Sequence, residues 1–363
     1  MDGLGKDAIP PGALAGLKVI DMASLYAAPL AATIMADFGA DVLKIEPHEG
    51  DQFRNSKMWP MVARGKRCLA LDLRAADGIE TFKALVAQAD VVVENYPAAV
   101  LAKRGIGWDV LSAINPRLVM LSVSCFGATG IYSERPGSGT IGEGFGGLTW
   151  LMGESDGPPT LPSVALGDAV GAMSAVIGTL SALYWRDRNG RGQQVDASLY
   201  EPVLQIVAHA AQRWTPGQSP ERCGSRLPGV LRNVYRTADN RFVTISASTA
   251  RHQADLVGLA GGEGDDEDAR VAAWIATVPQ AELVSRLAAG RIPVAPVNNL
   301  DQLLADPHVR ERASLVHVES AELGDLALAA PTPRLSETPG RIGLVNPPLG
   351  TDSREALARW TAS

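Results

Sequence analysis

The chain has little cysteine and no cluster of positive charge. Its 363 residues include three cysteines, Cys68, Cys125 and Cys223, which are odd in number and far apart. This spacing excludes a disulfide framework and a CxxC metal or redox site, and it favours a reducing, cytoplasmic location. The formal net charge is −7, and the longest basic run is Lys66-Arg67. A nucleic-acid partner is therefore not expected.

Long apolar runs are also scarce. The first twelve residues contain Asp2, Lys6, Asp7 and two prolines, so we expect a disordered lead-in rather than a signal peptide. One run, residues 168–185, is nearly long enough to cross a bilayer. It is rich in Gly, Ala, Ser and Thr and is followed by charged residues, so we expect a helix buried inside a large domain and no membrane partner.

The common nucleotide and hydrolase motifs are missing. No G-x-G-x-x-G follows the first predicted strand, and no G-x-x-x-x-G-K-[ST], H-E-x-x-H or G-x-S-x-G occurs. These absences disfavour an NAD-dependent dehydrogenase, a P-loop enzyme, a zinc protease and an α/β-hydrolase. The histidines show no ligand spacing, so no metal site is expected; they are His48, His209, His252, His308 and His317.

What the sequence does contain is an alternation of strands and helices. Short apolar runs at 17–23, 40–46, 68–73, 91–96 and 118–126 predict buried strands, and helical spacing occurs at 28–40 and 76–89. Such alternation requires crossover connections and a parallel sheet covered by helices. We therefore predict an α/β fold with a Rossmann-like large domain.

A change of composition marks a second domain. Residues 215–228 are rich in Pro, Gly, Ser and Arg and predict a linker after a large domain of residues 1–214. Beyond it, residues 229–324 predict a small α+β domain that begins with a hairpin turning at Ala238-Asp239-Asn240. Residues 325–363 predict an extended passage and a C-terminal helix that returns to the large domain.

Several motifs, in order along nearly the whole chain, resemble one family. They are LAGLKVID (14–21), ADFGADVLKIEP (36–47), VVENY (92–96), NPRL (115–118), FGATG (126–130), GESDGPP (153–159), LGD (166–168), GRGQQVDASLYE (190–201) and ADPHVR (305–310). The family is that of the class III (CaiB/BaiF-type) coenzyme A transferases, which includes carnitine-CoA and formyl-CoA transferases and α-methylacyl-CoA racemases. Each motif is weak alone, and the ordered set is specific.

The resemblance implies that Asp168 is the catalytic nucleophile. In the family's transferases this carboxylate passes through an aspartyl anhydride and an aspartyl-CoA thioester. Independently, an aspartate at a helix start is expected to favour its ionised form, which a carboxylate nucleophile needs. Gly167 lacks a Cβ and would let a bulky thioester approach. The alternative is an ordinary helix N-cap.

The same resemblance suggests residues that contact coenzyme A. Glu94 and Asn95 end a buried strand, where open α/β sheets bind ligands, and the alternative is a strand-end turn and helix cap. The basic residues Arg64, Lys66 and Arg67 suit the phosphates of coenzyme A, or else form a solvated turn. Arg54 matches a family arginine near the nucleotide. Asp196 and Glu201 are expected to have structural roles.

Two positions depart from the family pattern. Racemases carry a His-Asp pair where this chain has Ser138 and Gly139, which cannot exchange an α-proton near neutral pH. The family's Ala-Gly-Pro is replaced by Ala-Ala-Pro at 27–29, with Tyr26 before it, and this change can alter how closely coenzyme A or the acyl group packs.

The expected function is therefore a cytoplasmic transferase that moves coenzyme A between carboxylic acids. No permanently bound cofactor or metal is expected, because coenzyme A is itself the substrate. A racemase of α-methylacyl-CoA and a non-catalytic CoA-binding homologue are the alternatives. The resemblance also implies an interlocked homodimer, since two extended passages flank the small domain. The sequence does not identify the acids.

Overall fold

The chain folds into two units, and the first contains the predicted parallel sheet. The computed structural model describes residues 11–350 together with Ala358 and Trp360. The first unit is drawn from Met1–Leu148, Leu161–Gln212 and Ala313–Ser363, and the second from Thr149–Thr160 and Arg213–Arg312. The predicted lead-in at residues 1–10 lies outside the described residues, as does most of the predicted C-terminal helix.

The sheet of the first unit has six strands in the order β3-β2-β1-β4-β5-β6, and all neighbouring strands are parallel. Its strands are β1 (Lys18–Asp21), β2 (Asp41–Glu46), β3 (Arg67–Ala70), β4 (Val91–Glu94), β5 (Val119–Ser124) and β6 (Gln194–Ser198). Between them run α1 (Ala27–Asp37), α2 (Trp59–Ala63), α3 (Ala76–Val86), α4 (Ala98–Lys103), α5 (Trp108–Ile114), α6 (Gly139–Phe145) and α8 (Leu166–Asn189), and α9 (Tyr200–Ala211) follows β6. The predicted Rossmann-like sheet is confirmed.

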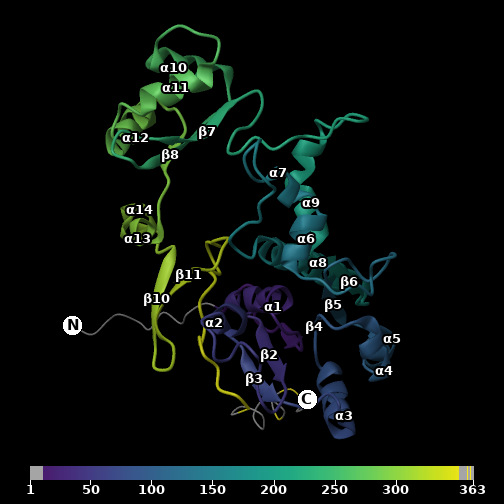
Figure 1. Ribbon diagram of the computed structural model, residues 1–363. Coiled ribbons are helices and arrows are strands. Elements are labelled where there is room, and N and C mark those ends of the chain that lie inside the picture. The colour runs from purple at the N-terminus through teal and green to yellow at the C-terminus, as the bar shows by residue number, and fades with distance from the viewer. Residues whose placement is uncertain (1–10, 351–357, 359, 361–363) are drawn as a thin grey trace, which may run out of the picture. The chain divides into compact units, whose positions relative to one another are not determined.

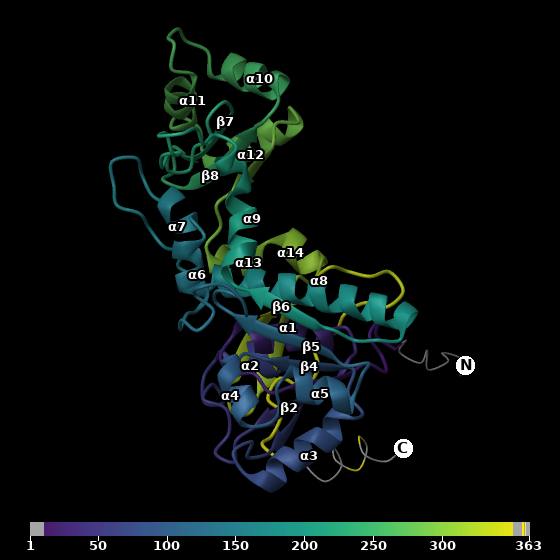
Figure 2. The same cartoon turned by 90° about the vertical axis from the view of Figure 1, so that its right-hand side faces the viewer.

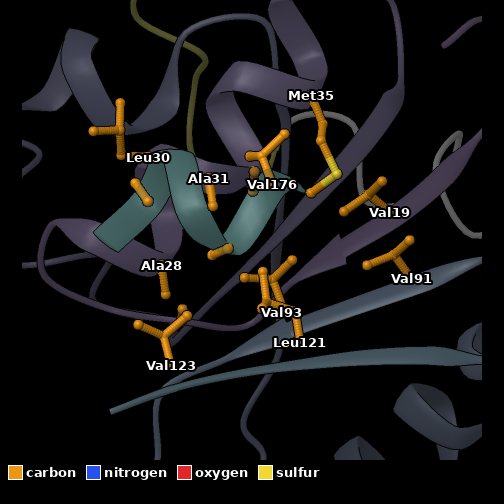
Figure 3. Close-up of a cluster of buried hydrophobic side chains, with 14 of the residues drawn as sticks. Val19, Ala28, Leu30, Ala31, Met35, Val91, Val93, Leu121, Val123 and Val176 are labelled. Carbon is orange, nitrogen blue, oxygen red and sulfur yellow. The ribbon is translucent and has the colours of Figure 1, made fainter. Parts of the chain in front are cut away.

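Each face of the sheet has its own apolar core, because neighbouring residues of a strand point to opposite faces. Val19 and Val93 lie with α1 and α8 on one face, which Figure 3 shows. Ile20 and Val92 lie with α3, α4 and α5 on the other. Figures 1 and 2 show these three helices beside the sheet. Burial on both faces explains the continuous apolar runs of the strands. Trp360 belongs to the second core, and its indole Nε1 donates to Asp41 Oδ2 at 3.1 Å.

The second unit contains an antiparallel sheet in the order β7-β8-β9. Its strands are β7 (Leu231–Arg236), β8 (Phe242–Ala247) and β9 (Val294–Pro296), and its helices include α10 (Ala250–Ala260), α11 (Glu267–Ile275), α12 (Gln280–Ala289), α13 (Leu300–Ala305) and α14 (Pro307–Glu311). The hairpin of β7 and β8 is confirmed, and its turn contains Asn240 at φ 59°. A four-residue helix, α7 (Leu148–Leu151), spans the first boundary between the units.

The boundaries of the units differ from the predicted ones. The small unit ends at Arg312 rather than at residue 324, and it also takes in Thr149–Thr160. The hairpin of β10 (Leu315–Ser320) and β11 (Gly324–Ala329) belongs to the first unit. The physical reason is that Leu326 and Leu328 bury their side chains against Val345 and Met61 of that unit.

Helix α8 is not buried all round as predicted. Small residues such as Ala172 and Ala175 face the sheet, and α8 also contacts α1, α6 and α9. The other side is apolar but exposed, along Met173, Ile177, Leu180 and Tyr184. Among the described residues α8 is the one helix long and apolar enough to cross a membrane, and 44% of its most apolar stretch is buried.

Candidate active site

A large cavity of the first unit lies where the sheet reverses its strand order. Strands β1 and β4 are neighbours at this point. Strands β2 and β3 extend the sheet beyond β1, and β5 and β6 extend it beyond β4. Open α/β sheets bind ligands at this point, outside the carboxyl ends of the strands. The cavity has a volume of about 840 Å³, and its lining includes Tyr26, Glu94, Asn95 and Asp168. The structure thus brings together Glu94, Asn95 and Asp168, which are three of the seven predicted site residues.

Asp168 enters this cavity from the first turn of α8. Helix α6 packs so closely there that a Cβ on Gly139 would lie 2.3 Å from Asp168 Oδ2. The backbone N–H of Gly139 donates a hydrogen bond to the Asp168 carboxylate. Next to it, the buried N–H of Gly167 donates to Glu143 Oε1 at 2.7 Å. The Asp168 carboxylate is therefore held on one side by backbone and is open on the other.

Gly167 has a different role from the predicted one. A Cβ at this position would lie 2.5 Å from the carbonyl oxygen of Gly139 and 3.1 Å from Cγ of Glu143. The missing side chain therefore lets α6 pack against α8, and it does not make room for a thioester.

The pKa of Asp168 is also opposite to the expectation from the helix start. Burial raises it, and the nearby Glu143 carboxylate raises it further, while the hydrogen bond from Gly139 lowers it. Desolvation thus outweighs the stabilisation of the charge by backbone. A carboxylate with a raised pKa is more basic when ionised, which favours attack on an acyl carbon.

Glu94 and Asn95 line the same cavity but have different partners. The Tyr96 N–H donates to Glu94 Oε2 at 2.7 Å, and the Ser122 hydroxyl also donates to this carboxylate. Burial raises the pKa of Glu94 to about 7. Asn95 binds the backbone of Ser24 twice, accepting from its N–H at 3.0 Å and donating to its carbonyl at 2.7 Å. The alternative of a strand-end turn therefore explains most of the hydrogen bonds that Glu94 and Asn95 form.

Glu94→Gln should change how stability depends on pH. The native pKa of about 7 exceeds the ordinary value of 4.5, so the native state binds more protons than the unfolded state between these values. This contribution to stability is present below pH 4.5 and is lost as the pH rises through 7. A neutral glutamine escapes the loss, and its advantage over wild type should be about 2–3 kcal/mol greater at pH 8 than at pH 5.

Urea unfolding of both proteins at the two pH values measures this difference. A stability difference that stays constant between pH 5 and pH 8 would contradict the buried, protonated Glu94.

The four predicted basic contacts do not line either described cavity. Arg54 forms an ion pair with Glu46 at 2.6 Å, and Arg67 forms one with Asp41 at 2.5 Å. Arg64 is buried and pairs through two nitrogens with Asp37, at 3.1 and 2.8 Å. The alternative of a solvated turn is also wrong for Arg64 and Lys66, because both side chains are buried.

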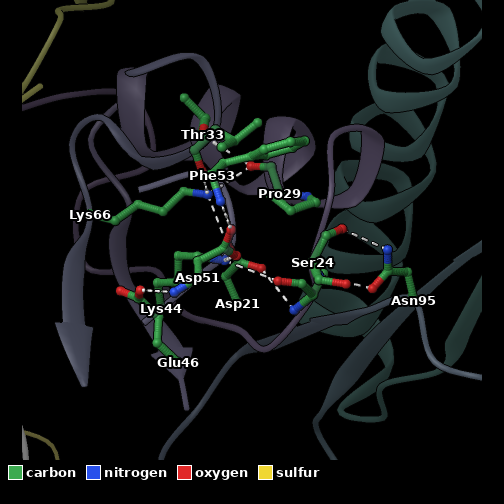
Figure 4. A network of polar contacts seen from close by, with 12 residues as sticks. Asp21, Ser24, Pro29, Thr33, Lys44, Glu46, Asp51, Phe53, Lys66 and Asn95 are labelled. Carbon is green, nitrogen blue, oxygen red and sulfur yellow. Dashed lines mark hydrogen bonds and ion pairs between the residues drawn. The ribbon is translucent and has the colours of Figure 1, made fainter. Parts of the chain in front are cut away.

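Lys66 lies in a buried network of charges, shown in Figure 4. Its ammonium is 2.8 Å from Asp21 Oδ2 and also donates to the carbonyls of Pro29 and Val62. Lys44 lies 3.7 Å from the same Asp21 oxygen. Burial lowers the pKa of Lys66 to about 8, while the two lysines lower the pKa of Asp21. We therefore assign Lys66 and Arg64 to the structure of the first unit rather than to coenzyme A.

The remaining predictions concern the loop around residue 130 and the turn after β6. Both carboxylate oxygens of Asp196 accept the N–H of Ala128 at 2.9 Å, and Glu201 accepts from the Ser198 hydroxyl at 2.6 Å. These contacts fit the predicted structural roles, and Asp196 in addition lines the larger cavity. Within the described part of the chain no group of three or more His, Cys, Asp or Glu residues could hold a metal ion.

Sequence reasoning missed three basic residues at the cavities. A second cavity of about 220 Å³ is lined by Arg74 and Arg104 and shares Tyr96 with the larger one. Arg104 also lies over the Tyr96 ring, 5.5 Å from its centroid. Arg135 is the one Lys or Arg among the described residues that line the larger cavity. A usable signal was the position of Arg74 and Arg104 shortly after β3 and β4, on the ligand-binding side of the sheet.

Comparisons with known proteins identify the family and relatives of this chain. Residues 14–353 match the model of CoA-transferase family III. Succinyl-CoA–D-citramalate CoA-transferase of Chloroflexus aurantiacus is 35% identical over 375 residues, covering 95% of this chain and 93% of the relative. Succinate–glutarate CoA-transferase of Agrobacterium fabrum is 30% identical, covering 96% of this chain and 95% of the relative.

Solved structures show the same fold. A CaiB/BaiF family protein from Brucella suis has a TM-score of 0.84 at 29% identity, covering 97% of this chain and 100% of that one. Rv3272 from Mycobacterium tuberculosis has a TM-score of 0.82 at 23% identity, covering 96% and 99%, and supports the fold alone. The family match over nearly the whole chain, together with relatives that are named CoA-transferases, supports CoA transfer. The chain belongs to CoA-transferase family III.

Proposed function

We propose that this protein transfers coenzyme A from an acyl-CoA thioester to a free carboxylic acid, with Asp168 as the nucleophile. The observation that carries the proposal is the Asp168 carboxylate, which is open to the 840 Å³ cavity and is held from behind by the Gly139 backbone. A carboxylate fixed in this way can attack an acyl carbon without moving the helix that bears it.

The chemistry needs no other co-reactant. An oxygen of Asp168 bonds to the thioester carbonyl carbon and the C–S bond breaks, leaving a mixed anhydride and the CoA thiolate. The thiolate then attacks the Asp168 γ-carbonyl of the anhydride and releases the first acid, which gives an aspartyl-CoA thioester. The acceptor carboxylate attacks this thioester and its C–S bond breaks, which gives a second mixed anhydride and frees the thiolate. The thiolate finally attacks the acceptor's acyl carbon, and the C–O bond to Asp168 breaks, which restores the carboxylate.

Coenzyme A can span the two cavities through Tyr96, which lines both. In this arrangement the acyl thioester lies near Asp168, and the phosphates lie near Arg74 and Arg104. Guanidinium groups suit phosphate because they make paired, charge-assisted hydrogen bonds. This assignment replaces the basic residues 54–67, which line neither described cavity. Arg74 pairs with Asp72 at 2.8 Å, and this solvent-exposed pair has to open for the guanidinium to meet a phosphate.

The relatives suggest which acids to test first. Those described above are named for succinyl-CoA or succinate with D-citramalate or glutarate. We therefore propose short dicarboxylic acids as substrates. Succinyl-CoA and other acyl-CoA donors should be crossed with a panel of free acids in D₂O, and the products read by mass.

New acyl-CoA formed from the free acid is the expected result. The racemase alternative predicts instead rapid α-deuteration of a 2-methylacyl-CoA without migration of coenzyme A. Ser138 and Gly139 argue against it, because neither side chain can carry the α-proton. A CoA-binding homologue without turnover predicts neither product, and the presence of Asp168 in the cavity argues against it.

We also propose that the protein acts as an interlocked homodimer. The exposed apolar stripe of α8, Met173, Ile177, Leu180 and Tyr184, fits a surface that a second copy covers. The chain also passes between the units four times, at 148/149, 160/161, 212/213 and 312/313.

Sedimentation should show a species of about twice 38.2 kDa that persists on dilution to nanomolar concentration. Met173→Glu, which places a charge in the stripe, should weaken this species, whereas Arg251→Glu on an exposed helix of the small unit should not. A stable, active monomer of the wild type at nanomolar concentration would contradict the interlocked dimer.

A further inference from the structure

Tyr26 is a polar side chain of the cavity that the proposed chemistry has not yet used. It lies directly before α1, at the end of the loop that follows β1, and it lines the same cavity as Asp168. Its side chain is partly buried, and its hydroxyl makes no hydrogen bond to the residues that the structure describes. The hydroxyl is not sealed from solvent, so it can exchange water for a ligand that enters the cavity.

The backbone around Tyr26 is held in an unusual conformation. Leu25, directly before it, has φ 66°, in the left-handed region that residues other than glycine rarely adopt. One residue earlier, the backbone of Ser24 donates one hydrogen bond to the Asn95 side chain and accepts another from it, and Figure 4 shows this contact. Asn95 thus joins the loops after β1 and β4 at the point where the sheet reverses its order. Such local strain persists only where the surroundings enforce it, and it is common at functional sites.

Tyr26 also responds to the charge of the nucleophile. Burial raises the pKa of the Tyr26 phenol, and the Asp168 carboxylate raises it further, while Arg64 lowers it. The phenol is therefore kept in its protonated form beside the group that attacks the thioester. A protonated phenol can donate one hydrogen bond to an oxygen that gains negative charge.

We propose that the Tyr26 hydroxyl donates a hydrogen bond to the oxyanion that forms on the acyl carbonyl when Asp168 attacks. This inference rests on the proposed function, because the oxyanion exists only if Asp168 adds to a thioester or anhydride carbonyl. The donor keeps its proton throughout. As the C–O bond forms, negative charge moves to the carbonyl oxygen, and it leaves with the CoA thiolate when the C–S bond breaks. Tyr26 is thereby a catalytic residue, and Asn95 is the positioning residue of its loop.

Tyr26→Phe removes the donor and keeps the ring that packs against the first core. Loss of one oxyanion donor typically costs about 10²–10³-fold in kcat. We therefore expect kcat for CoA transfer to fall by about 10²-fold while KM for acyl-CoA changes by less than about threefold. Tyr132→Phe is the control, because it makes the same change at a tyrosine that does not itself line the cavity, and it keeps the ring that contacts Arg135. It should retain wild-type kcat.

A second measurement separates hydrogen bonding from packing. Replacing Tyr26 by a fluorinated tyrosine lowers the pH at which the phenol ionises, so the alkaline limb of the kcat profile should move to lower pH. An unmoved limb, or a Tyr26→Phe enzyme with kcat within about threefold of wild type, would overturn the inference. A different result would contradict the proposed function itself, namely a wild-type enzyme that transfers no coenzyme A.

Discussion

Asp168→Asn should lower kcat for CoA transfer by about 10³-fold or more, because the amide cannot form the anhydride or the aspartyl thioester. Asparagine has nearly the shape of aspartate, so the close packing of Gly139 against this side chain is preserved. Stability should not fall, since burial already disfavours the charged form of Asp168. The rate is measured as transfer of labelled coenzyme A from an acyl-CoA to a free acid.

Asp187→Asn is the matched control for this substitution. It makes the same change on the same helix, at an exposed side chain that pairs with Arg117 and Arg186. This control should keep wild-type kcat. An Asp168→Asn enzyme that retains near-normal turnover, in a preparation shown by mass to be free of deamidated protein, would rule out Asp168 as the nucleophile.

Lys66→Met should be the most destabilising of the proposed substitutions. The side chain is fully buried and shares Asp21 with Lys44, so its loss leaves the Asp21 carboxylate with one lysine at 3.7 Å. Breaking a buried ion pair on one side typically costs about 3–5 kcal/mol, and the remaining lysine places this case near the lower end. Urea unfolding measures the loss. Variant enzyme that is still folded should keep its KM for acyl-CoA, since Lys66 lines neither cavity.

Arg104→Ala should raise KM for acyl-CoA with little loss of stability, which is the opposite of the result expected for Lys66→Met. Arg104 lines the smaller cavity and forms no ion pair with the residues that the structure describes. Its removal costs the contact with the Tyr96 ring and should change stability by about 0.5 kcal/mol or less. KM for acyl-CoA should rise because a phosphate contact is lost. If Lys66→Met raised KM more than Arg104→Ala does, the sequence-based assignment of Lys66 to coenzyme A would be restored.

The α/β class of the fold was predictable because its strands are buried on both faces. Runs such as Val91 to Val93 are apolar on both faces of the strand, so they indicate a parallel sheet that is covered by helices on both sides. The order of the strands was not predictable from such runs, because pairing depends on contacts between distant segments. Ile20, for example, lies opposite both Leu43 and Val92. The exposed side of α8 was missed for a related reason, since an apolar stretch does not reveal whether a core or a second chain covers it.

The candidate site was predicted in part. Asp168, Glu94 and Asn95 line one cavity. They could be predicted because each lies in a motif at a strand end or a helix start. The basic residues 64–67 were misassigned because sequence shows charge but not burial. Their partners lie 26 to 45 residues earlier in the chain, at Asp21, Asp37 and Asp41. Tyr26 was noticed only as a departure from the family pattern, and its relation to Asp168 required the structure.

Trapping the covalent intermediate tests the central claim most directly. Wild-type enzyme is incubated with a productive acyl-CoA, treated with borohydride, digested, and read by mass spectrometry. An aspartyl thioester or anhydride is reduced to an alcohol, so the account predicts this change at Asp168 alone, dependent on the acyl-CoA and absent from Asp168→Asn. Active enzyme with unmodified Asp168, or with the adduct on another side chain such as Glu94 or Cys125, would contradict it.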